Sequence, residues 1–544
     1  MARGTAVPAP ADYYTRNLAH MFAWVRRHHA RLLDARLARW MERFEGLPEP
    51  ARHLFVRLLL RRGPDFRIDR IAYPGVDDAR SAALALALGG FGALVTDPGR
   101  RLESLRVPEL KARLRVAGVP APPRARRTDL LEALASAVAG HGALPLLLRL
   151  TPGEEIDCLR MLYFGSLRQD LVEFIVADVG ALRWPQVTLD PSLPFETPAQ
   201  VRSALRLHRL ADLVSELHHV PREHASAVDP RLLDGLTDAL SASSPCSHTE
   251  GRRARALLRI AALQGRQGRR CAQLRALRRA GTPAARERAC RLLAGNGRRR
   301  AAERLRSAML RAPADAREAR FAERFDVHAG RCRPRRRGCG VPVRRLRLAG
   351  RSADMRVEAR VAALFAAAGN RVLHMENRLP GMLFALGFWD VVFSPLPGAF
   401  VQPFQAGPTD LHGPSFRARR REAIATRLAD IAADRFGVDA FLEVLDREQG
   451  RVNAFWGWQD TAHAEALLRS VPASLRAGIC DVVAAEPGRA RAGFPDLVVG
   501  NGEPGCCAFI EVKGPGDQLR EDQRRWIEDL RRLGARAEVL EVRW

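Results

Sequence analysis

The chain has 544 residues, 47% of them hydrophobic, and a mean hydropathy of −0.19, which is enough for three or four domains with sizeable cores. No apolar run reaches the length of a membrane span, residues 1–10 lack a signal-peptide pattern, and the nine cysteines are scattered and odd in number. We therefore expect a cytoplasmic, nucleoid-associated protein and no secreted disulfide scaffold. The formal net charge of +27 favours a polyanionic partner, with nucleic acid ahead of an acidic membrane.

The N-terminal half is predicted to be mostly helical. Residues 11–62 have the apolar spacing of amphipathic helix, which Gly63-Pro64 ends, and residues 66–73 predict a short strand or turn. The arginine face of the helical segment suits a solvated surface as well as a contact with DNA.

Residues 105–138 predict two helices around a proline-rich loop. The apolar positions expected to pack between the helices are Leu105, Leu110, Leu114, Leu130 and Leu134. The segment resembles a SAP motif, a DNA-binding helix–loop–helix, although a generic helical hairpin gives the same pattern. Its basic residues would contact DNA phosphates without reading sequence, and they are Lys111, Arg113, Arg124, Arg126 and Arg127.

More helix is predicted over residues 141–222 and 225–312. The second of these stretches could stack as helix pairs resembling tetratricopeptide repeats, but it has no clean 34-residue period, so a plain helical spacer is the alternative. Residues 331–347 are strongly basic and interrupted by glycine and proline, which predicts a linker loop.

Chemistry is concentrated near the C-terminus, where residues 495–500 and 508–513 predict two neighbouring strands joined by a glycine-rich turn. Side chains alternate along a strand, so Glu511 and Lys513 lie on one face, and Asp496 at the start of the other strand can lie beside them. Two carboxylates and a lysine suit a divalent-metal phosphodiesterase: the acids hold the metal, and the lysine orients water or stabilises negative charge.

The alternative is a surface salt bridge between Glu511 and Lys513. The chain has 88 Lys and Arg residues, yet lysine occurs only at Lys111 and Lys513. A lysine provides a compact charge that an arginine cannot imitate, so its presence beside the paired acid favours the functional interpretation.

A helix is predicted over residues 517–533, with Asp517 as its N-cap and Gly534 after its end. Gln523 falls on its apolar stripe, where a polar side chain needs a partner such as backbone at the rim. A last strand, residues 537–542, would join the sheet.

These residues carry a resemblance to a known family. Pro495-Asp496, a spacer of fourteen residues and Glu511-Val512-Lys513 resemble the PD-(D/E)xK nuclease signature. Gly514-Pro515-Gly516-Asp517-Gln518-Leu519, with Gln523 and Trp526, is similar to the VRR-NUC branch. Together with the leucine-rich segment before Arg61-Arg62-Gly63-Pro64, the pattern resembles the bacterial type of Fanconi-associated nucleases.

The resemblance implies a metal site and its surroundings. Glu376, Asp496, Glu511 and the Val512 carbonyl would hold one or two Mg²⁺ or Mn²⁺ ions. It also implies that Gln523 approaches the metal site, as the alternative to a backbone-bonded position at the rim. Asp390 has apolar neighbours in the sequence, which predict either a buried structural acid or a group that supports the ligands. The surroundings are less basic than in relatives with a 5′-phosphate pocket, and Arg489 and Arg491 could compensate by contacting DNA.

The resemblance also implies a function: a structure-specific DNA nuclease with 5′-flap endonuclease and 5′-to-3′ exonuclease activity in interstrand crosslink repair. Its partner would be branched or flapped duplex DNA, with a monomer favoured and the oligomeric state open. The alternatives are a Holliday-junction-type resolvase and a catalytically silent DNA-binding scaffold.

The expected fold class is a mostly α N-terminal half followed by an α/β restriction-endonuclease-like domain with a central mixed sheet. The expected domains are residues 1–103, a helical DNA-binding region; 104–224, a SAP-like helical domain; 225–349, a tetratricopeptide-like spacer with the basic linker; and 350–544, the VRR-NUC nuclease domain.

Overall fold

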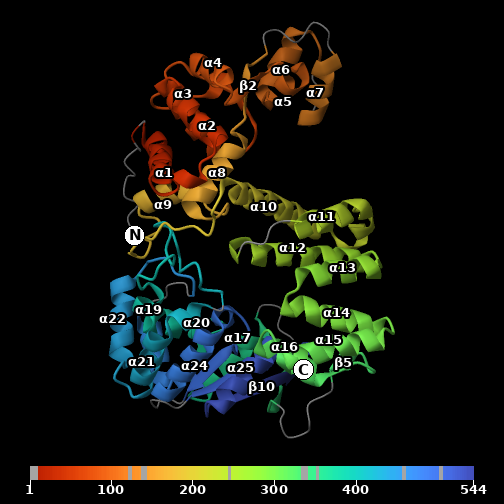
Figure 1. Cartoon of the computed structure of the whole chain (residues 1–544), viewed down its shortest axis with the longest axis vertical. Coiled ribbons are helices and arrows are strands. Elements are labelled where there is room, and N and C mark those ends of the chain that lie inside the picture. The colour runs from red at the N-terminus through yellow and green to blue at the C-terminus, as the bar shows by residue number, and fades with distance from the viewer. Residues whose placement is uncertain are drawn as a thin grey trace. The chain divides into compact units, whose positions relative to one another are not determined.

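The computed structural model describes residues 10, 12–120, 125–136, 144–242, 247–332, 341–350, 355–375, 377–413, 415–455, 461–500 and 507–544. The chain divides into two compact units (Figure 1). The first unit comprises residues 1–179, 193–323 and 327–330, and the second comprises residues 180–192, 324–326 and 331–544.

The first unit opens with several short helices in place of the long helical segment expected over residues 11–62. The helices before residue 180 are α1 (Tyr13–His28), α2 (Ala35–Glu45), α3 (Glu49–Leu59), α4 (Ala79–Leu88), α5 (Pro98–Glu103), α6 (Val107–Val116), α7 (Arg127–Ser136), α8 (Gly153–Phe164) and α9 (Val172–Asp178), with the 3-10 turns η1 (Ala30–Leu32) and η2 (Ile68–Arg70). The breaks have local causes, because Asp34 caps α2 by accepting a hydrogen bond from Leu37 N and Pro48 precedes α3.

A small antiparallel sheet lies in the same part of the chain, with strand order β1-β3-β2. Its strands are β1 (Asp65–Arg67), β2 (Gly92–Val95) and β3 (Leu147–Leu150). The prediction of a strand or turn over residues 66–73 is confirmed by β1 and the turn η2 that follows it.

The expected helical hairpin is confirmed as α6 and α7. Its interior is a separate hydrophobic cluster made of Leu102 with Leu105, Leu110, Leu114, Leu130 and Leu134, so each leucine predicted to pack there is buried.

The rest of the first unit is a succession of helices. They are α10 (Pro198–His218), α11 (Pro230–Ala242), α12 (Ser247–Arg266), α13 (Arg270–Ala280), α14 (Pro283–Gly295), α15 (Arg299–Arg311) and α16 (Ala316–Arg324), with the turn η3 (Arg222–Ala227). Consecutive helices from α12 to α15 pack side by side (Figure 1). The reversals use helix-end chemistry: Gly281, with φ +66°, ends α13, and Thr282 caps α14.

The second unit is built on a five-stranded mixed sheet of order β6-β10-β9-β8-β7. Its strands are β6 (Val343–Arg347), β7 (Arg371–His374), β8 (Leu497–Gly500), β9 (Cys507–Lys513) and β10 (Arg536–Arg543), and β4 (Phe325–Asp326) pairs with β5 (Arg331–Cys332) outside it. β10 runs parallel to β6 and β9, while β8 is antiparallel to both of its neighbours. The predicted central mixed sheet after a helical N-terminal region is confirmed.

The linker loop expected over residues 331–347 is wrong for its last five residues, which form β6. This strand pairs in parallel with β10, and Arg344 and Arg345 form ion pairs with Glu538 and Glu541 of that strand. A partner almost two hundred residues away leaves no signal in local composition, and an exposed edge strand can be rich in arginine.

Helices cover both faces of this sheet. The helices of the second unit are α17 (Val357–Ala367), α18 (Leu379–Gly387), α19 (Trp389–Val392), α20 (Ser415–Arg419), α21 (Arg421–Ala432), α22 (Val438–Glu448), α23 (Thr461–Ser470), α24 (Ala473–Ala485) and α25 (Glu521–Arg532), with the turn η4 (Pro487–Arg491). One face of the sheet, which includes Val498 and Phe509, packs in a core with α18, α24 and α25. The other face, which includes Ile510 and Val512, packs against α17. β9 is therefore a central strand with both faces covered.

The last predicted helix begins later than expected, at Glu521, and its N-cap is Arg520. Asp517, the predicted cap, instead accepts a hydrogen bond from Gly514 N within the turn that follows β9. Within the described ranges, none of the helices is long and apolar enough to span a membrane.

Candidate active site

The strand pairing brings together the three residues predicted to carry the chemistry. Leu497 of β8 pairs with Ile510 of β9, so Asp496, one residue before β8, lies beside Glu511. Asp496 Oδ2 accepts a hydrogen bond of 2.8 Å from Val512 N. Lys513 Nζ lies 2.8 Å from Glu511 Oε1. The predicted alternation is confirmed, since Glu511 and Lys513 share one face and Ile510 and Val512 belong to the core on the other.

Burial sets the electrostatics of Glu511, whose residue surface is 1% exposed. Desolvation, followed by the negative charge of Asp496, raises the pKa of Glu511 to about 7, while Lys513 and Arg520 act in the opposite direction. The influence of Arg520 was not foreseen, because one arginine among many gives no signal in the sequence.

The donor set fits a divalent cation. Both carboxylate oxygens of Glu511 are buried. Lys513 Nζ lies within hydrogen-bond distance of Oε1, and Oε2 has no hydrogen-bond partner among the described residues. A buried acceptor without hydrogen bonds calls for an explanation. A hard cation held between this carboxylate and Asp496 supplies one. No group of three or more His, Cys, Asp or Glu side chains suited to a metal occurs among the described residues.

The segment that presents Asp496 is fixed by α25. Gly493 has φ +84°, and a Cβ at this position would lie 2.6 Å from the backbone carbon of Asp522, so only glycine permits this close approach. Trp526 of α25 donates its indole N–H to the carbonyls of Arg489 and Ala492, at 3.2 Å each. α25, the helix that follows the signature, therefore fixes the backbone of the residues just before β8.

A second segment supports the same strand from β7. Met375 N donates to Asp496 O at 2.9 Å, and Phe494 N donates to the side chain of Asn377 at 3.0 Å. Asn377 has φ +55°, a conformation that asparagine tolerates better than most residues. Glu376, predicted as the third acid, lies outside the described residues, but its two neighbours in the chain both contact the segment around Asp496.

Gln523 and Asp390 have different surroundings. Gln523 is buried, and its side-chain oxygen accepts a 3.0 Å hydrogen bond from Arg520 N at the start of α25; this is the backbone-bonded alternative, and a role near a metal stays a prediction. The Asp390 side chain is 60% exposed and bonds Arg427 at 2.6 Å. The expectation that Asp390 is buried is therefore wrong, because α19 turns this residue towards solvent.

The two arginines predicted to contact DNA near the site have partners within the chain. Arg489 pairs with Asp529 and lies over the Trp526 ring, 4.3 Å from its centroid, and burial lowers its pKa. Arg491 donates to the carbonyl of Ala454. These contacts give both residues a structural role, and a contact with DNA stays a prediction.

The basic residues predicted on the hairpin belong to the first unit. Lys111, Arg126 and Arg127 are exposed there, and Arg113 is half-buried. Arg127 also donates to the carbonyl of Glu103. Arg124 lies outside the described residues.

Comparisons with known proteins agree with this geometry. The family description "VRR-NUC domain" matches residues 439–544, and "FAN1, HTH domain" matches residues 12–92. The Fanconi-associated nuclease 1 homolog of Pseudomonas aeruginosa is 31% identical over 591 residues, which cover 99% of this chain and 97% of that protein. The Arabidopsis thaliana homolog is 25% identical over 606 residues, covering 98% of this chain and 67% of that protein.

Solved structures are also similar. The crystal structure of paFAN1 bound to 2nt 5′flap DNA with gap matches with a TM-score of 0.84 and 28% identity, over 99% of each chain. The structure of paFAN1 bound to 1nt 5′flap DNA with gap matches with a TM-score of 0.81 and 28% identity, over 98% of this chain and 99% of that one. With its nuclease signature assembled at the centre of the sheet and its similarity to relatives over its full length, the chain belongs to the Fanconi-associated nuclease family.

Proposed function

We propose that this nuclease cuts 5′-flap DNA by metal-dependent hydrolysis at the Asp496–Glu511–Lys513 site, as part of interstrand crosslink repair. The observation that carries the proposal is the buried Glu511 carboxylate, whose Oε2 has no hydrogen-bond partner among the described residues, beside a second carboxylate and an ion-paired lysine. The flap substrate is supported by similarity over 99% of the chain to a protein whose structure is described as bound to 5′-flap DNA.

Glu376, Asp496, Glu511 and the Val512 carbonyl would hold one or two Mg²⁺ or Mn²⁺ ions. A bound divalent cation supplies Lewis-acid polarisation of the phosphate and an attacking water of lowered pKa. Asp496 is oriented for this role by the hydrogen bond from Val512 N. The two chain neighbours of Glu376 contact residues around Asp496, which supports Glu376 as the third acid.

Lys513 would orient the attacking water and stabilise negative charge on the phosphate. Its ammonium is anchored 2.8 Å from Glu511 Oε1, so its remaining N–H donors can orient a water beside the carboxylates. The same positive charge would stabilise the negative charge that develops on the phosphate during in-line attack. Its side chain is 13% exposed, and low exposure strengthens such an interaction.

The finer architecture belongs to the same proposal. The second unit, with helices on both faces of a mixed sheet, would be a restriction-endonuclease-like nuclease domain. The α6–α7 hairpin would be a SAP-like DNA-binding module, and the stacked helices α12 to α15 would be a tetratricopeptide-like spacer. We expect the chain to act as a monomer that holds double-stranded DNA through its helical part.

The test compares wild type with Asp496→Ala on end-labelled 5′-flap, 3′-flap and four-way-junction DNA, with Mg²⁺, Mn²⁺ or EDTA. Asp481→Ala is the matched control, because it removes an exposed carboxylate of the same unit that pairs with Arg417. Metal polarisation supplies several kcal/mol, so we expect Asp496→Ala to lower flap cleavage by about 10³-fold and the control to retain it.

Each other result has a definite meaning. Preferential cutting of the four-way junction would keep the site but replace the flap substrate with the substrate of a resolvase. Binding of DNA without cleavage in either metal would leave a DNA-binding scaffold. Retained cleavage by a folded Asp496→Ala protein would exclude this site as the catalytic centre.

A further inference from the structure

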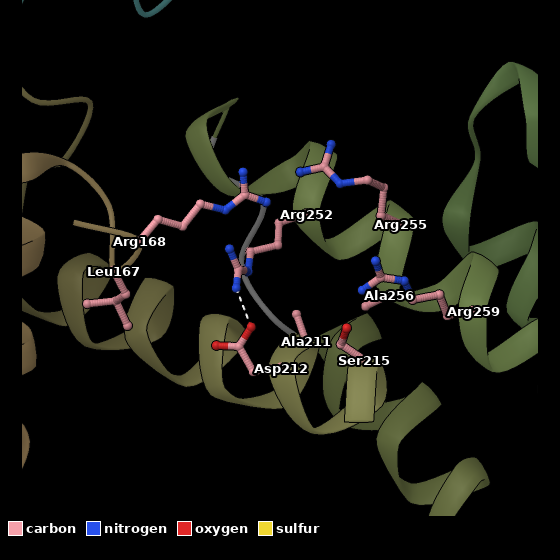
Figure 2. A pocket seen from close by; sticks show the side chains of 9 residues that line it. All are labelled: Leu167, Arg168, Ala211, Asp212, Ser215, Arg252, Arg255, Ala256 and Arg259. Atoms are coloured by element: carbon pink, nitrogen blue, oxygen red, sulfur yellow. Dashed lines mark hydrogen bonds and ion pairs between the residues drawn. The ribbon is translucent and has the colours of Figure 1, made fainter. Parts of the chain in front are cut away.

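A cavity of about 300 Å³ in the first unit gathers four arginines around one acid (Figure 2). Arg252, Arg255 and Arg259 come from α12 at a spacing of three and four residues, which places them on one face of the helix. Arg168 joins them from the segment after α8, and Asp212 faces them from α10. The cavity is assembled within one unit by segments that are distant in sequence.

Most of this positive charge has no acidic partner among the residues that the structure describes. Asp212 pairs with Arg252 at 2.5 Å. The side chains of Arg168, Arg255 and Arg259 make no hydrogen bond or ion pair with any described residue. Burial lowers the pKa of Arg255, and the charges of Arg168, Arg252 and Arg259 act in the same direction because like charges repel one another.

One residue that lines the cavity also has a buried donor without an acceptor. The Arg252 side chain is 17% exposed, and its Nε is fully buried with no hydrogen-bond partner among the described residues. Ser215 of α10 lines the same cavity and adds a hydroxyl group. An anion with several oxygens could accept from the guanidinium groups of Arg168, Arg255 and Arg259 together, and guanidinium groups match phosphate geometry in pairs of parallel hydrogen bonds.

A second arginine-rich cavity of the first unit shows that composition alone does not produce this arrangement. That cavity, of about 370 Å³, contains Arg36, Arg39 and Arg43. There Arg36 bonds Glu155 at 2.5 Å, and Arg43 lies over the Phe91 ring. Two of its three arginines therefore have partners within the fold, unlike Arg255 and Arg259 on α12.

We infer that the arginine cavity of α12 binds a backbone phosphate of the DNA substrate and so positions the duplex on the protein. This inference rests on the proposed function and adds to it a phosphate site built from Arg168, Arg252, Arg255 and Arg259. A phosphodiester offers two unesterified oxygens, which suit a site with several converging guanidinium groups. The role is one of positioning, because the site binds the substrate without contacting the reacting atoms.

The test measures binding of the full chain, in the Asp496→Ala background and with EDTA, to fluorescent 5′-flap DNA over a range of salt. The variant Arg255→Gln/Arg259→Gln removes two charges from the cavity. The variant Arg278→Gln/Arg279→Gln removes the same charge from the exposed surface of the next helix, α13. We expect the cavity variant to bind about 10- to 100-fold more weakly and to lower the salt slope by about one phosphate contact, with little change in the control.

A second measurement locates the phosphate. In a series of DNAs that each carry one uncharged methylphosphonate, one position should weaken binding of the parent protein, while the cavity variant should be insensitive at that position. Arg255→Lys, which keeps the charge, should retain the salt slope. Because these readouts are binding in EDTA, they are independent of whether the protein cleaves flaps.

The inference is overturned by equal weakening in both double variants, which would show a general charge effect, or by the absence of a methylphosphonate position that the cavity variant ignores. Titration with inorganic phosphate or ATP tests the other source of the same chemistry. If either ligand binds the parent protein and not the cavity variant, while DNA affinity is unchanged, the cavity belongs to a free phosphate compound instead.

Discussion

Glu511→Gln should make the metal-free protein more stable while abolishing metal-dependent cleavage. Glutamine has nearly the shape of a protonated glutamic acid and carries no charge. In the fold the pKa of Glu511 rises from 4.5 to about 7, chiefly through burial and then through Asp496. One pKa unit corresponds to about 1.4 kcal/mol, so the charged side chain costs the native state about 3 kcal/mol above pH 7.

The sign of the pH effect follows from the raised pKa. Between pH 4.5 and about 7 the unfolded chain releases the proton while the folded protein keeps it. The stability that this group contributes is therefore fully present at low pH, is lost as the pH rises through this window, and stays low above it. The advantage of Glu511→Gln should be about 3 kcal/mol at pH 8.5 and roughly 2 kcal/mol smaller at pH 5.5.

The assay is urea unfolding in EDTA at the two pH values, with hydrogen exchange of β9 peptides to assign the transition to the second unit. Glu541→Gln is the control, because this exposed acid on β10 pairs in register with Lys513, and its loss should change stability by less than about 0.5 kcal/mol. Adding Mn²⁺ should stabilise wild type and leave Glu511→Gln unchanged. An advantage that is absent at pH 8.5, or equal at both pH values, would refute the reasoning.

Three further predictions concern the same site. Gly493→Ala should destabilise the second unit by about 1–3 kcal/mol in urea unfolding, because its Cβ would meet the Asp522 backbone at a positive φ; Gly488→Ala, with nothing within 4 Å, should not, and equal effects would contradict the account. The affinity for Mn²⁺, measured by calorimetry, should fall as the pH drops through about 7, because protons compete for Glu511; a flat profile would exclude Glu511 as a ligand. Removing divalent cations with EDTA should abolish cleavage and adding Mg²⁺ or Mn²⁺ should restore it; cleavage that persists in EDTA would exclude a metal mechanism.

The candidate site was predictable because its information is local. Alternation along β9 places Glu511 and Lys513 on one face, and a rare lysine beside an acid distinguishes this strand from a sequence that otherwise uses arginine. The leucines of the α6–α7 hairpin were predictable for the same reason, since their helical spacing lies within thirty residues.

Features that depend on long-range pairing were not predictable. β6 has the composition of a basic loop and becomes a strand through its pairing with β10. The helical period over residues 11–62 continues through turns that Asp34 and Pro48 introduce. Asp390 has apolar neighbours in sequence, yet α19 exposes its side chain. For β6 and Asp390 the deciding contact or orientation belongs to the folded chain, whereas the breaks at Asp34 and Pro48 have local signals that the continuous helical period outweighed.

The excess of positive charge shows most clearly the difference between what the local sequence predicts and what only the fold decides. A net charge of +27 indicates a polyanionic partner, but it does not say which arginines are available to one. Arg489 lies near the nuclease signature in sequence and is occupied by Asp529 and Trp526. Arg255 and Arg259 lie in an unremarkable helical stretch, and the fold places them around a cavity with a single acid. The folded positions of the acidic side chains therefore determine which arginines can bind a phosphate. For this reason the sequence pointed to Arg489, whereas the structure points to the arginines of α12.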